Sequence, residues 1–291
     1  MIDTPQIDFT KVGVIGWPIS HSRSPMIHNY WISKHDLRGT YTRLPIDPAN
    51  DFKTEIAKLI EQNYQGANVT IPHKEAAFAV ADELDAMAAK LGAVNLLTFS
   101  AGTIHGRNTD GYGFMAHLKT VADHIYFNIA LKQKPVCVLG AGGATRAILA
   151  ALAEHGVGEI HLCNRTRERA EEIAHLGVPS NVTVFNWDDR DQAVEGCGLL
   201  VNTTSLGMAD GLALDIGLAG LADEAIVYDI IYTPLETELL KQAKSRGLKA
   251  VGGLGMLLHQ AVPAFEAWFG VRPEVTDALY ELVLADLEIP K

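Results

Sequence analysis

Three features that mark membrane, exported or nucleic-acid-binding proteins are missing from the sequence. No run of residues approaches the roughly 20 apolar residues that a membrane-spanning helix needs. The first residues, MIDTPQIDFT, have neither a basic start nor an apolar stretch, which predicts no signal or transit peptide. The net charge of −11 argues against a general surface for phosphate backbones or anionic membranes. We therefore expect a cytoplasmic protein that binds neither nucleic acid nor membranes.

Cysteines are scarce, and their spacing forms no recognisable pattern. The three of them, Cys137, Cys163 and Cys197, follow neither a disulfide nor a metal-ligand motif. Cys137 and Cys163 lie in apolar runs, where a thiol behaves as a small hydrophobic side chain. We predict reduced thiols in the core of an intracellular protein, and no metal site.

Repeats, low-complexity stretches and Gly/Ser linkers are absent too, while the overall composition is ordinary. The 291 residues are 48% hydrophobic and 20% charged, which is typical of a globular chain with one large or two ordinary domains. Short apolar segments alternate with helical ones, and this alternation starts afresh at Val136. The pattern predicts an α/β fold with largely parallel sheets. We predict domains at residues 1–111 and 112–253, followed by carboxyl-terminal helices at 254–291.

Each series predicts a set of short elements. In the first, strands are expected at 12–16 and 66–71, and a hairpin at 94–99 and 103–107. Helices are expected over 52–62, over 83–91 and from Pro25 onward, with Ser24 as the N-cap. Pro263 predicts a kink or a helix end. The second series predicts strands at 136–139, 160–163, 182–185, 199–202, 226–230 and 249–251, and helices at 144–155, 167–176 and 236–246.

The strongest motif is a glycine turn between a buried strand and a helix. Its sequence, from Val136 to Ala147, is VCVLGAGGATRA. Gly140 permits a tight turn, Gly142 lets the backbone approach a pyrophosphate, and the helix N-terminus adds partial positive charge beside phosphate oxygens. Thr145 replaces the last glycine of the usual G-x-G-x-x-G pattern, so the match is a variant. The strand before it and the helix after it still favour dinucleotide binding over a merely structural turn.

The residues after the second strand of this series select the cofactor. NAD-specific sites usually have an acidic residue there, which binds the ribose 2′-hydroxyl. Here the position is Asn164, and the next residues, RTRER, include Arg165 and Arg169. Guanidinium groups bind a 2′-phosphate that a carboxylate would repel. The alternative is that these arginines merely cover a solvated helix start, although cations there oppose the helix dipole. The segment favours NADP.

Polar loops follow the apolar strands of the first series. Four segments, at 20–25, 68–74, 92–95 and 108–111, supply hydroxyls, carboxamides, one amine and one carboxylate. Ligands of open α/β sheets bind at the carboxyl ends of strands, so we expect these loops to converge. Such groups suit a small polyhydroxylated substrate better than an apolar one.

Together these motifs resemble the shikimate dehydrogenase family over essentially the whole chain. The matching stretches, in order, are GWPISHSRSPMIHN, NVTIPHK, GAVN, NTDGYGF, GAGGATRA, NRTRERA, NTTSLGM and GLGMLLHQA. The resemblance implies a mixed or parallel α/β substrate domain and a Rossmann-type NADP-binding domain separated by a cleft. It also implies that the carboxyl-terminal helices return to the substrate domain. The activity that it implies is the NADPH-dependent, reversible reduction of 3-dehydroshikimate to shikimate in aromatic amino-acid biosynthesis.

The resemblance also assigns roles to particular residues. It implies that Ser22 and Ser24 bind the substrate carboxylate, and that Lys74 and Asp110 form a catalytic pair that also touches the substrate. The further substrate contacts that it implies are Asn68, Thr70, Asn95, Tyr232 and Gln260. The implied cofactor contacts are Gly140, Ala141, Gly142, Gly143, Ala144, Asn164, Arg165, Thr166, Arg169, Thr204, Ser205, Met208, Ile230 and Gly253.

Reduction of a ketone needs a proton on oxygen as well as a hydride on carbon. Lys74 is the natural proton donor, and its alternative role is to stabilise the negative charge that grows on the substrate oxygen. One departure from the family pattern is Leu96, which follows Asn95 where GA-x-NT is usual, so a hydroxyl is lost from that loop. We interpret His21, His28 and His259 as structural.

Two other functions and two oligomeric states stay open. A quinate/shikimate dehydrogenase of broader specificity would favour an acidic residue where Asn164 stands. A non-catalytic NADPH-binding regulator would have lost Lys74 or Asp110, and both are present. A monomer and a homodimer are equally compatible with the sequence.

Overall fold

The computed structural model describes residues 9–175, 181–209 and 211–288. Contacts between Cα atoms divide the chain into two compact units, one formed by Met1–Thr109 with Gln260–Lys291 and the other by Asp110–His259. The second junction lies inside helix α11 (Leu254–Phe269), whereas the sequence suggested a boundary just before this helix. One continuous helix therefore contributes residues to both units.

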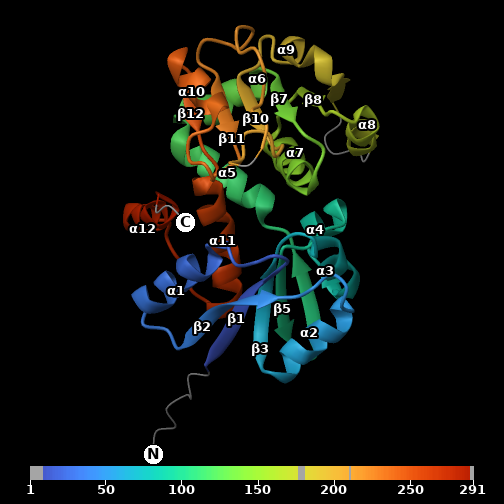
Figure 1. The fold of residues 1–291 in the computed structure, drawn as a ribbon, viewed down its shortest axis with the longest axis vertical. Coiled ribbons are helices and arrows are strands. Elements are labelled where there is room, and N and C mark those ends of the chain that lie inside the picture. The colour runs from blue at the N-terminus through green and yellow to red at the C-terminus, as the bar shows by residue number, and fades with distance from the viewer. Residues whose placement is uncertain (1–8, 176–180, 210, 289–291) are drawn as a thin grey trace, which may run out of the picture. The chain divides into compact units, whose positions relative to one another are not determined.

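The first unit is built on a mixed six-stranded sheet in the order β2-β1-β3-β5-β6-β4. Figure 1 labels four of its strands, β2, β1, β3 and β5. β1 pairs in parallel with β2 and β3, while β5 is antiparallel to both β3 and β6. The predicted hairpin is therefore confirmed. The strands are β1 (Thr10–Gly16), β2 (Gly39–Pro45), β3 (Tyr64–Val69), β4 (Glu83–Leu84), β5 (Leu96–Ser100) and β6 (Thr103–Arg107).

Alternation along β3 separates a core face from a polar face. Ala67 and Val69 join a buried cluster with Ile15 and Ile56, whereas Asn68 lies between them and points to the opposite face. On that opposite face Asn68 meets Tyr41, which comes from β2. Because side chains alternate along the strand, β3 packs into the core on one side and carries Asn68, a predicted substrate contact, on the other.

The helices of the first unit correct several predicted boundaries. They are α1 (Ser24–Lys34), α2 (Phe52–Glu61), α3 (Lys74–Val80), α4 (Ala86–Leu91) and α12 (Asp277–Glu288), with the carboxyl-terminal part of α11. Arg23, and not Ser24, occupies the N-cap of α1. The helix predicted from Glu83 begins only at Ala86, because Glu83 and Leu84 pair with β6 and Asp85 caps the helix by accepting from the Ala88 amide.

Three further outcomes concern elements that local patterns missed or misplaced. The strand predicted to end at Ile71 ends at Val69, and β2 and α3 were not predicted at all. Pro263 lies inside α11, so it does not end the helix. Leu96, the departure from the family pattern, is fully buried as the first residue of β5, which explains an apolar side chain there.

The second unit is built on a sheet of six parallel strands in the order β12-β11-β10-β7-β8-β9. All six strands predicted from the second series are present, so the parallel α/β prediction is confirmed. They are β7 (Val136–Leu139), β8 (Ile160–Cys163), β9 (Val182–Phe185), β10 (Leu199–Asn202), β11 (Ile226–Asp229) and β12 (Lys249–Val251).

Helices of the second unit lie before β7, after the glycine turn and after later strands. They are α5 (Asp110–Val121), α6 (Leu131–Gln133), α7 (Gly143–His155), α8 (Arg167–His175), α9 (Arg190–Ala193) and α10 (Glu238–Ser245), with a π-helical turn at Tyr126–Ala130 and a 3-10 turn at Trp187–Asp189. The three predicted helices correspond to α7, α8 and α10. The predicted end of α8, at residue 176, lies outside the described residues.

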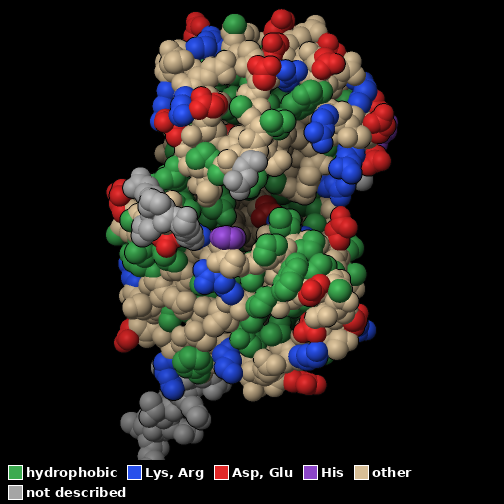
Figure 2. Space-filling model, in the orientation of Figure 1, with side chains coloured by type: hydrophobic (Ala, Val, Ile, Leu, Met, Phe, Trp, Pro, Cys, Tyr) green, Lys and Arg blue, Asp and Glu red, His purple; other side chains and the backbone are tan. Residues whose placement is uncertain are grey.

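The three cysteines are buried and free, as predicted, within one hydrophobic cluster of the second unit. On the face shown in Figure 2, acidic and basic side chains are interspersed, and hydrophobic side chains gather over the α2–α3 region. No helix among the described residues is long and apolar enough to cross a membrane.

Candidate active site

A chain of hydrogen bonds in the first unit links Tyr41 of β2 to Asn68 of β3 and to Asn95, which stands just before β5. The Tyr41 hydroxyl donates to Asn68 Oδ1 at 2.7 Å, and Asn68 Nδ2 donates to the Asn95 carbonyl at 3.2 Å. Both asparagines are nearly inaccessible, with 5% and 3% of their surface exposed. Burial raises the pKa of Tyr41, so its hydroxyl stays protonated and remains a donor. The Asn68 carboxamide, which the sequence assigned to the substrate, is therefore held in a fixed orientation.

The same chain continues through Thr109 to Gln260. The Thr109 amide donates to Asn95 Oδ1 at 2.8 Å, Asn95 Nδ2 donates to Thr109 Oγ1 at 3.1 Å, and Thr109 Oγ1 donates to the Gln260 carbonyl at 3.0 Å. The structure thus brings together three predicted substrate residues, Asn68, Asn95 and Gln260. The sequence missed Tyr41 and Thr109 as parts of this network. Thr109 could have been found from its place in the NTDG segment, whereas nothing in the sequence singles out Tyr41.

The segment with the two predicted carboxylate-binding serines is held from three sides. Arg43 Nη2 donates to the Ser22 carbonyl at 2.8 Å, and the Ser24 amide donates to Ser22 Oγ at 3.3 Å. Between the serines, Arg23 is 8% exposed and forms an ion pair with Asp286 of α12 at 2.6 Å. Two guanidinium groups therefore lie at the segment where an anionic group is expected to bind, and the carboxyl-terminal helix fixes one of them.

Lys74 is half-buried and begins helix α3. Its backbone is anchored on both sides, because its carbonyl accepts from the Val94 amide at 3.0 Å and the buried His73 ring bonds to the Ile46 carbonyl at 2.7 Å. Thr70, also half-buried, closes the preceding turn by accepting from the His73 amide. Lys74 thus projects from a rigid base, next to the loop that leads to Asn95.

The predicted catalytic pair is divided between the two units. Lys74 belongs to the first, and Asp110, which is 9% exposed and begins α5, is the first residue of the second. Tyr232 also belongs to the second unit, whereas Gln260 is the residue at which the chain re-enters the first. The sequence placed all four at one site; the structure places Asp110 and Gln260 at the two points where the chain passes between units.

The glycine turn of the second unit fits a dinucleotide pyrophosphate. Gly140 has a φ of 114°, and a Cβ there would lie 2.5 Å from Thr203 Oγ1, so a side chain is excluded. Gly142 and Gly143 are exposed, with no heavy atom within 4 Å of a Cβ at either position. Thr145 Oγ1 accepts from the Gly142 amide at 3.0 Å and bonds to Thr203 Oγ1 at 2.7 Å, which fixes the turn. Ala141 and Ala144, on either side, are half-buried and small.

Three arginines follow β8, and the structure distinguishes them. Arg167 is engaged, because its Nε donates to Glu171 Oε1 at 2.7 Å and its Nη1 to Asn186 Oδ1 at 2.9 Å. Arg165 and Arg169, the two that were predicted to bind the 2′-phosphate, are exposed, as is Thr166. Asn164 Nδ2 donates to the Thr166 carbonyl at 2.7 Å and shapes the loop. The residues present therefore suit a phosphorylated ribose.

The remaining predicted cofactor contacts lie on loops after β10 and β11 and before α11. Ser205 and Met208 are exposed, and Thr204 is half-buried. Gly253 is buried against the loop after β11: a Cβ there would overlap the Ile230 carbonyl oxygen, so only glycine fits. Gly253 therefore allows the chain before α11 to pass directly beside Ile230.

Two buried histidines, His28 and His117, have structural partners, and His28 is one of those that the sequence analysis interpreted as structural. His28 is fully buried and stacks on Tyr41 with ring centroids 4.1 Å apart, and burial lowers its pKa to about 3. His117 hydrogen-bonds the Tyr228 hydroxyl at 2.6 Å, and burial followed by repulsion from His259 lowers its pKa to about 4. These rings are neutral at physiological pH. His21 is exposed.

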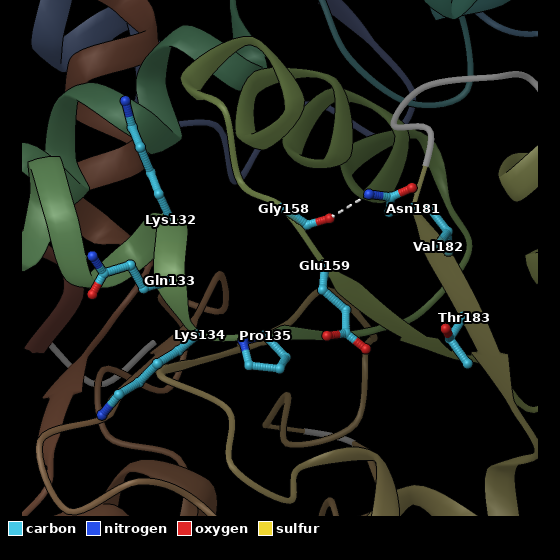
Figure 3. Close-up of a pocket in the computed structure, with 9 residues that line it drawn as sticks. All are labelled: Lys132, Gln133, Lys134, Pro135, Gly158, Glu159, Asn181, Val182 and Thr183. Carbon is cyan, nitrogen blue, oxygen red and sulfur yellow. Dashed lines mark hydrogen bonds between the residues drawn. The ribbon is translucent and has the colours of Figure 1, made fainter.

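A polar hollow of about 550 Å³ lies elsewhere on the second unit, at the amino ends of β7, β8 and β9 (Figure 3). Asn181 Nδ2 donates across it to the Gly158 carbonyl at 2.9 Å. It contains none of the predicted site residues. Ligands of parallel sheets bind at the opposite, carboxyl ends of the strands, so this hollow is not the candidate site. Its lining residues are Lys132, Gln133, Lys134, Pro135, Gly158, Glu159, Asn181, Val182 and Thr183.

A parallel sheet with an open glycine turn, an arginine pair after its second strand and a separate polar substrate unit defines a class. This is the class of dinucleotide-dependent oxidoreductases that are built from two units. Three family models match: the shikimate dehydrogenase substrate binding domain at residues 14–97, shikimate/quinate 5-dehydrogenase at 121–207, and the shikimate 5′-dehydrogenase C-terminal domain at 253–284. The chain belongs to the shikimate dehydrogenase family.

Individual relatives agree with this assignment. Shikimate dehydrogenase (NADP(+)) of Paramagnetospirillum magneticum is 50% identical over 278 residues, which cover 94% of this chain and 97% of that protein. Shikimate 5-dehydrogenase from Thermus thermophilus, in complex with NADP(H) and shikimate, is 32% identical with a TM-score of 0.82, covering 96% of this chain and all of that chain. Quinate dehydrogenase from Corynebacterium glutamicum, in complex with NAD, is 29% identical with a TM-score of 0.85, covering 96% and 99%. The fold alone thus does not separate the two activities, whereas the sequence identity favours the first.

Proposed function

We propose that this protein catalyses the reversible reduction of 3-dehydroshikimate to shikimate with NADPH as the cofactor. The observation that carries the proposal is the hydrogen-bonded chain of Asn68, Asn95, Thr109 and Gln260 in the first unit. A ring with several hydroxyl groups requires donors and acceptors in fixed positions, and this chain supplies them before the ligand arrives.

Recognition of the substrate divides into an anionic and a hydroxyl part. Ser22 and Ser24 hold the carboxylate, and the Arg43 guanidinium, bonded to the Ser22 carbonyl, adds a positive charge beside the same segment. Asn68, Thr70, Asn95 and Asp110 hold the ring hydroxyls, and Tyr232 and Gln260 complete the set. Hydrogen bonds within the first unit hold the buried carboxamides of Asn68 and Asn95 in place.

Proton transfer falls to Lys74. NADPH, when bound, supplies the hydride that reaches the ketone carbon. The Lys74 ammonium donates a proton from Nζ to the ketone oxygen, and in the reverse direction neutral Lys74 accepts the hydroxyl proton. We assign to Asp110 a hydrogen bond to the same substrate hydroxyl.

The 2′-phosphate of NADP is bound by Arg165 and Arg169 with the Asn164–Thr166 loop, while Gly140 to Ala144 hold the pyrophosphate. A carboxylate, which NAD-specific sites place after the second strand, is replaced by Asn164. We place the protein in the cytoplasm, in the shikimate pathway that leads to chorismate and the aromatic amino acids.

The test is nicotinamide absorbance with purified protein, using shikimate and quinate with NADP and NAD in all four pairings. Rapid reduction only with shikimate and NADP supports the proposal. Comparable rates with quinate, or with NAD, replace it by a broader quinate/shikimate dehydrogenase. No turnover in any pairing, with NADPH still bound, replaces it by a regulator.

A further inference from the structure

A buried carboxylate that the proposed chemistry does not use lies at the end of β11. Asp229 is fully buried, and Asn202, its register partner at the end of β10, is fully buried too. Asp229 Oδ1 accepts from Asn202 Nδ2 at 3.0 Å and from the Ile231 amide at 3.1 Å. Oδ2 accepts from Thr237 Oγ1 at 2.7 Å. Three elements thus meet at one side chain: β10, the loop after β11, and the start of α10.

Asn202 extends the network into the loop after β10. Its Oδ1 accepts from the amide and the hydroxyl of Thr204 at 3.0 and 2.7 Å, and its Nδ2 also donates to the Leu206 carbonyl at 3.1 Å. The Leu206 amide in turn donates to Thr204 Oγ1 at 3.1 Å. The loop after β10 and the loop after β11 are therefore joined through two buried side chains, Asn202 and Asp229.

The donors to Asp229 are an amide, a carboxamide and a hydroxyl, and none of them is a cation. Desolvation raises the pKa of this carboxyl, while the hydrogen bonds from Thr237, Ile231 and Asn202 act in the opposite direction. A buried carboxylate contributes little net stability compared with apolar residues that fill the same volume. The Asp229 carboxylate therefore serves to hold three donor groups, from Asn202, Ile231 and Thr237, around one side chain.

The topology places the nicotinamide half of the cofactor above these loops. The strand order reverses between β7 and β10, which is where dinucleotides lie across a doubly wound sheet. The glycine turn after β7 and the arginines after β8 occupy the adenosine side of this point. The other nucleotide half then falls on the side of β10 and β11, over the two joined loops.

We propose that Asp229, with Asn202 and Thr237, is a positioning lock that aligns the 203–208 and 230–232 loops for hydride transfer without touching cofactor or substrate. This inference rests on the proposed function, because it takes the bound nicotinamide as the donor of the hydride that reduces the substrate. The lock sets the geometry of the reacting carbon, whereas the affinity for the adenosine half is set by Arg165 and Arg169. Loss of the lock therefore lowers turnover more than it lowers cofactor affinity.

Thr237→Val tests the lock, because it removes the hydroxyl that bonds Asp229 and keeps the shape of the side chain. We expect kcat to fall at least tenfold, while the Kd for adenosine 2′,5′-bisphosphate, which occupies only the adenosine side, changes less than twofold. Thr237→Ser restores the hydroxyl and should return kcat to within threefold of the parent. Asp229→Asn, which keeps the shape of the central side chain, should also lower kcat without changing the affinity for the bisphosphate.

Thr237 also caps α10, so a matched control is needed. Its hydroxyl accepts from the Leu240 amide, just as the Asp51 carboxylate caps α2 by accepting from the Thr54 amide. Asp51→Ala should lower the Tm and leave kcat unchanged. If Thr237→Val lowers the Tm alone, with kcat within twofold of the parent, Thr237 is only a cap and the lock is refuted. A parallel loss of bisphosphate affinity also refutes it.

Failure of the proposed function gives a different result. In that case the parent protein itself reduces no NADP with shikimate. The lock is then tested by binding alone. Thr237→Val should raise the Kd for NADPH while the Kd for adenosine 2′,5′-bisphosphate stays as in the parent. A Kd for NADPH that is the same in the variant and the parent refutes the lock.

Discussion

The two units solve different binding problems with different sheets. In the first, a mixed sheet carries predicted substrate residues that are buried and bonded to one another, such as Asn68 and Asn95. In the second, a fully parallel sheet carries predicted cofactor residues of which several are exposed, such as Gly142, Gly143 and Arg165. The first unit is thus preorganised by side chains, and the second by its backbone.

Ligand chemistry explains the difference. A small ring with a carboxylate and several hydroxyls offers little area, so its affinity and orientation depend on donors and acceptors that are already aligned. A dinucleotide is long and anionic, and a helix N-terminus, a glycine turn and a few guanidinium groups suffice to hold its phosphates. Substitutions in the two units should therefore damage different kinetic constants.

The largest effect should come from Lys74. Lys74→Ala removes the proton donor and should lower kcat by roughly 10²- to 10⁴-fold, the usual contribution of general acid–base catalysis, while the KM for shikimate changes little. Steady-state kinetics measure both. Lys53→Ala, at an exposed position of α2, is the control and should behave as the parent. An unchanged kcat for Lys74→Ala would remove Lys74 from the chemistry.

The next largest effect should come from Arg165 in the second unit and should concern the KM for NADP. Arg165→Ala should raise the KM for NADP roughly 10- to 100-fold, because a hydrogen bond to a charged group contributes about 1.5–3 kcal/mol. The KM for shikimate should stay constant. Arg167→Ala is the matched control: it lies in the same segment, but its guanidinium is already bonded to Glu171 and Asn186. Equal effects of the two substitutions would contradict the assignment of the 2′-phosphate site.

A smaller effect, on the KM for shikimate and not on that for NADP, should follow from Thr109→Val in the first unit. It leaves the Asn95 carboxamide without its hydroxyl partner and should raise the KM for shikimate about tenfold, since a lost buried partner costs about 1–3 kcal/mol. The Kd for NADPH should not change. Thr109→Ser keeps the hydroxyl and should restore the KM. If the affinity for NADPH falls as much as that for shikimate, the division of labour between the units fails.

The last prediction concerns stability in acid, not a kinetic constant, and involves both units. His28 and His117 have folded-state pKa values lowered to about 3 and about 4, from an ordinary value of 6.5. Below pH 6.5 the unfolded chain binds protons that the folded chain does not, so stability is complete above this pH and declines as the pH falls towards 4 and 3. Each histidine should add a slope of up to about 1.4 kcal/mol per pH unit.

Denaturant unfolding of the His28→Phe variant between about pH 4 and pH 7 measures this slope. The variant should lose one histidine's share of the pH dependence, while His124→Gln, at an exposed position, should retain all of it. An unaltered slope in His28→Phe would mean that His28 accepts a proton in the folded protein.

Local patterns predicted the second unit far better than the first. Its six strands are short apolar runs, and each was found close to its observed bounds, as were α7 and α10 and the start of α8. The helices α5, α6 and α9 of this unit were not predicted. In the first unit, β2 and α3 were missed and α4 was started too early. The sequence of β2 is GTYTRLP, an edge strand with mixed polarity, and its pairing with β1 depends on contacts distant in sequence. Glu83 and Leu84 pair with β6, which also overrides helix propensity.

What the sequence by itself determined is the chemistry: a glycine turn, an arginine pair in place of an acidic residue, and loops with Lys74, serines and carboxamides. These signals are local, because each depends on residue types at fixed spacing along one strand, turn or helix. Only the tertiary structure decided how the carboxamides are held, that Arg167 is engaged with Glu171 and Asn186, and that Asp229 joins two loops. Those outcomes depend on partners many residues away, such as Thr109 with Gln260 and Arg23 with Asp286, which only folding brings within hydrogen-bond distance.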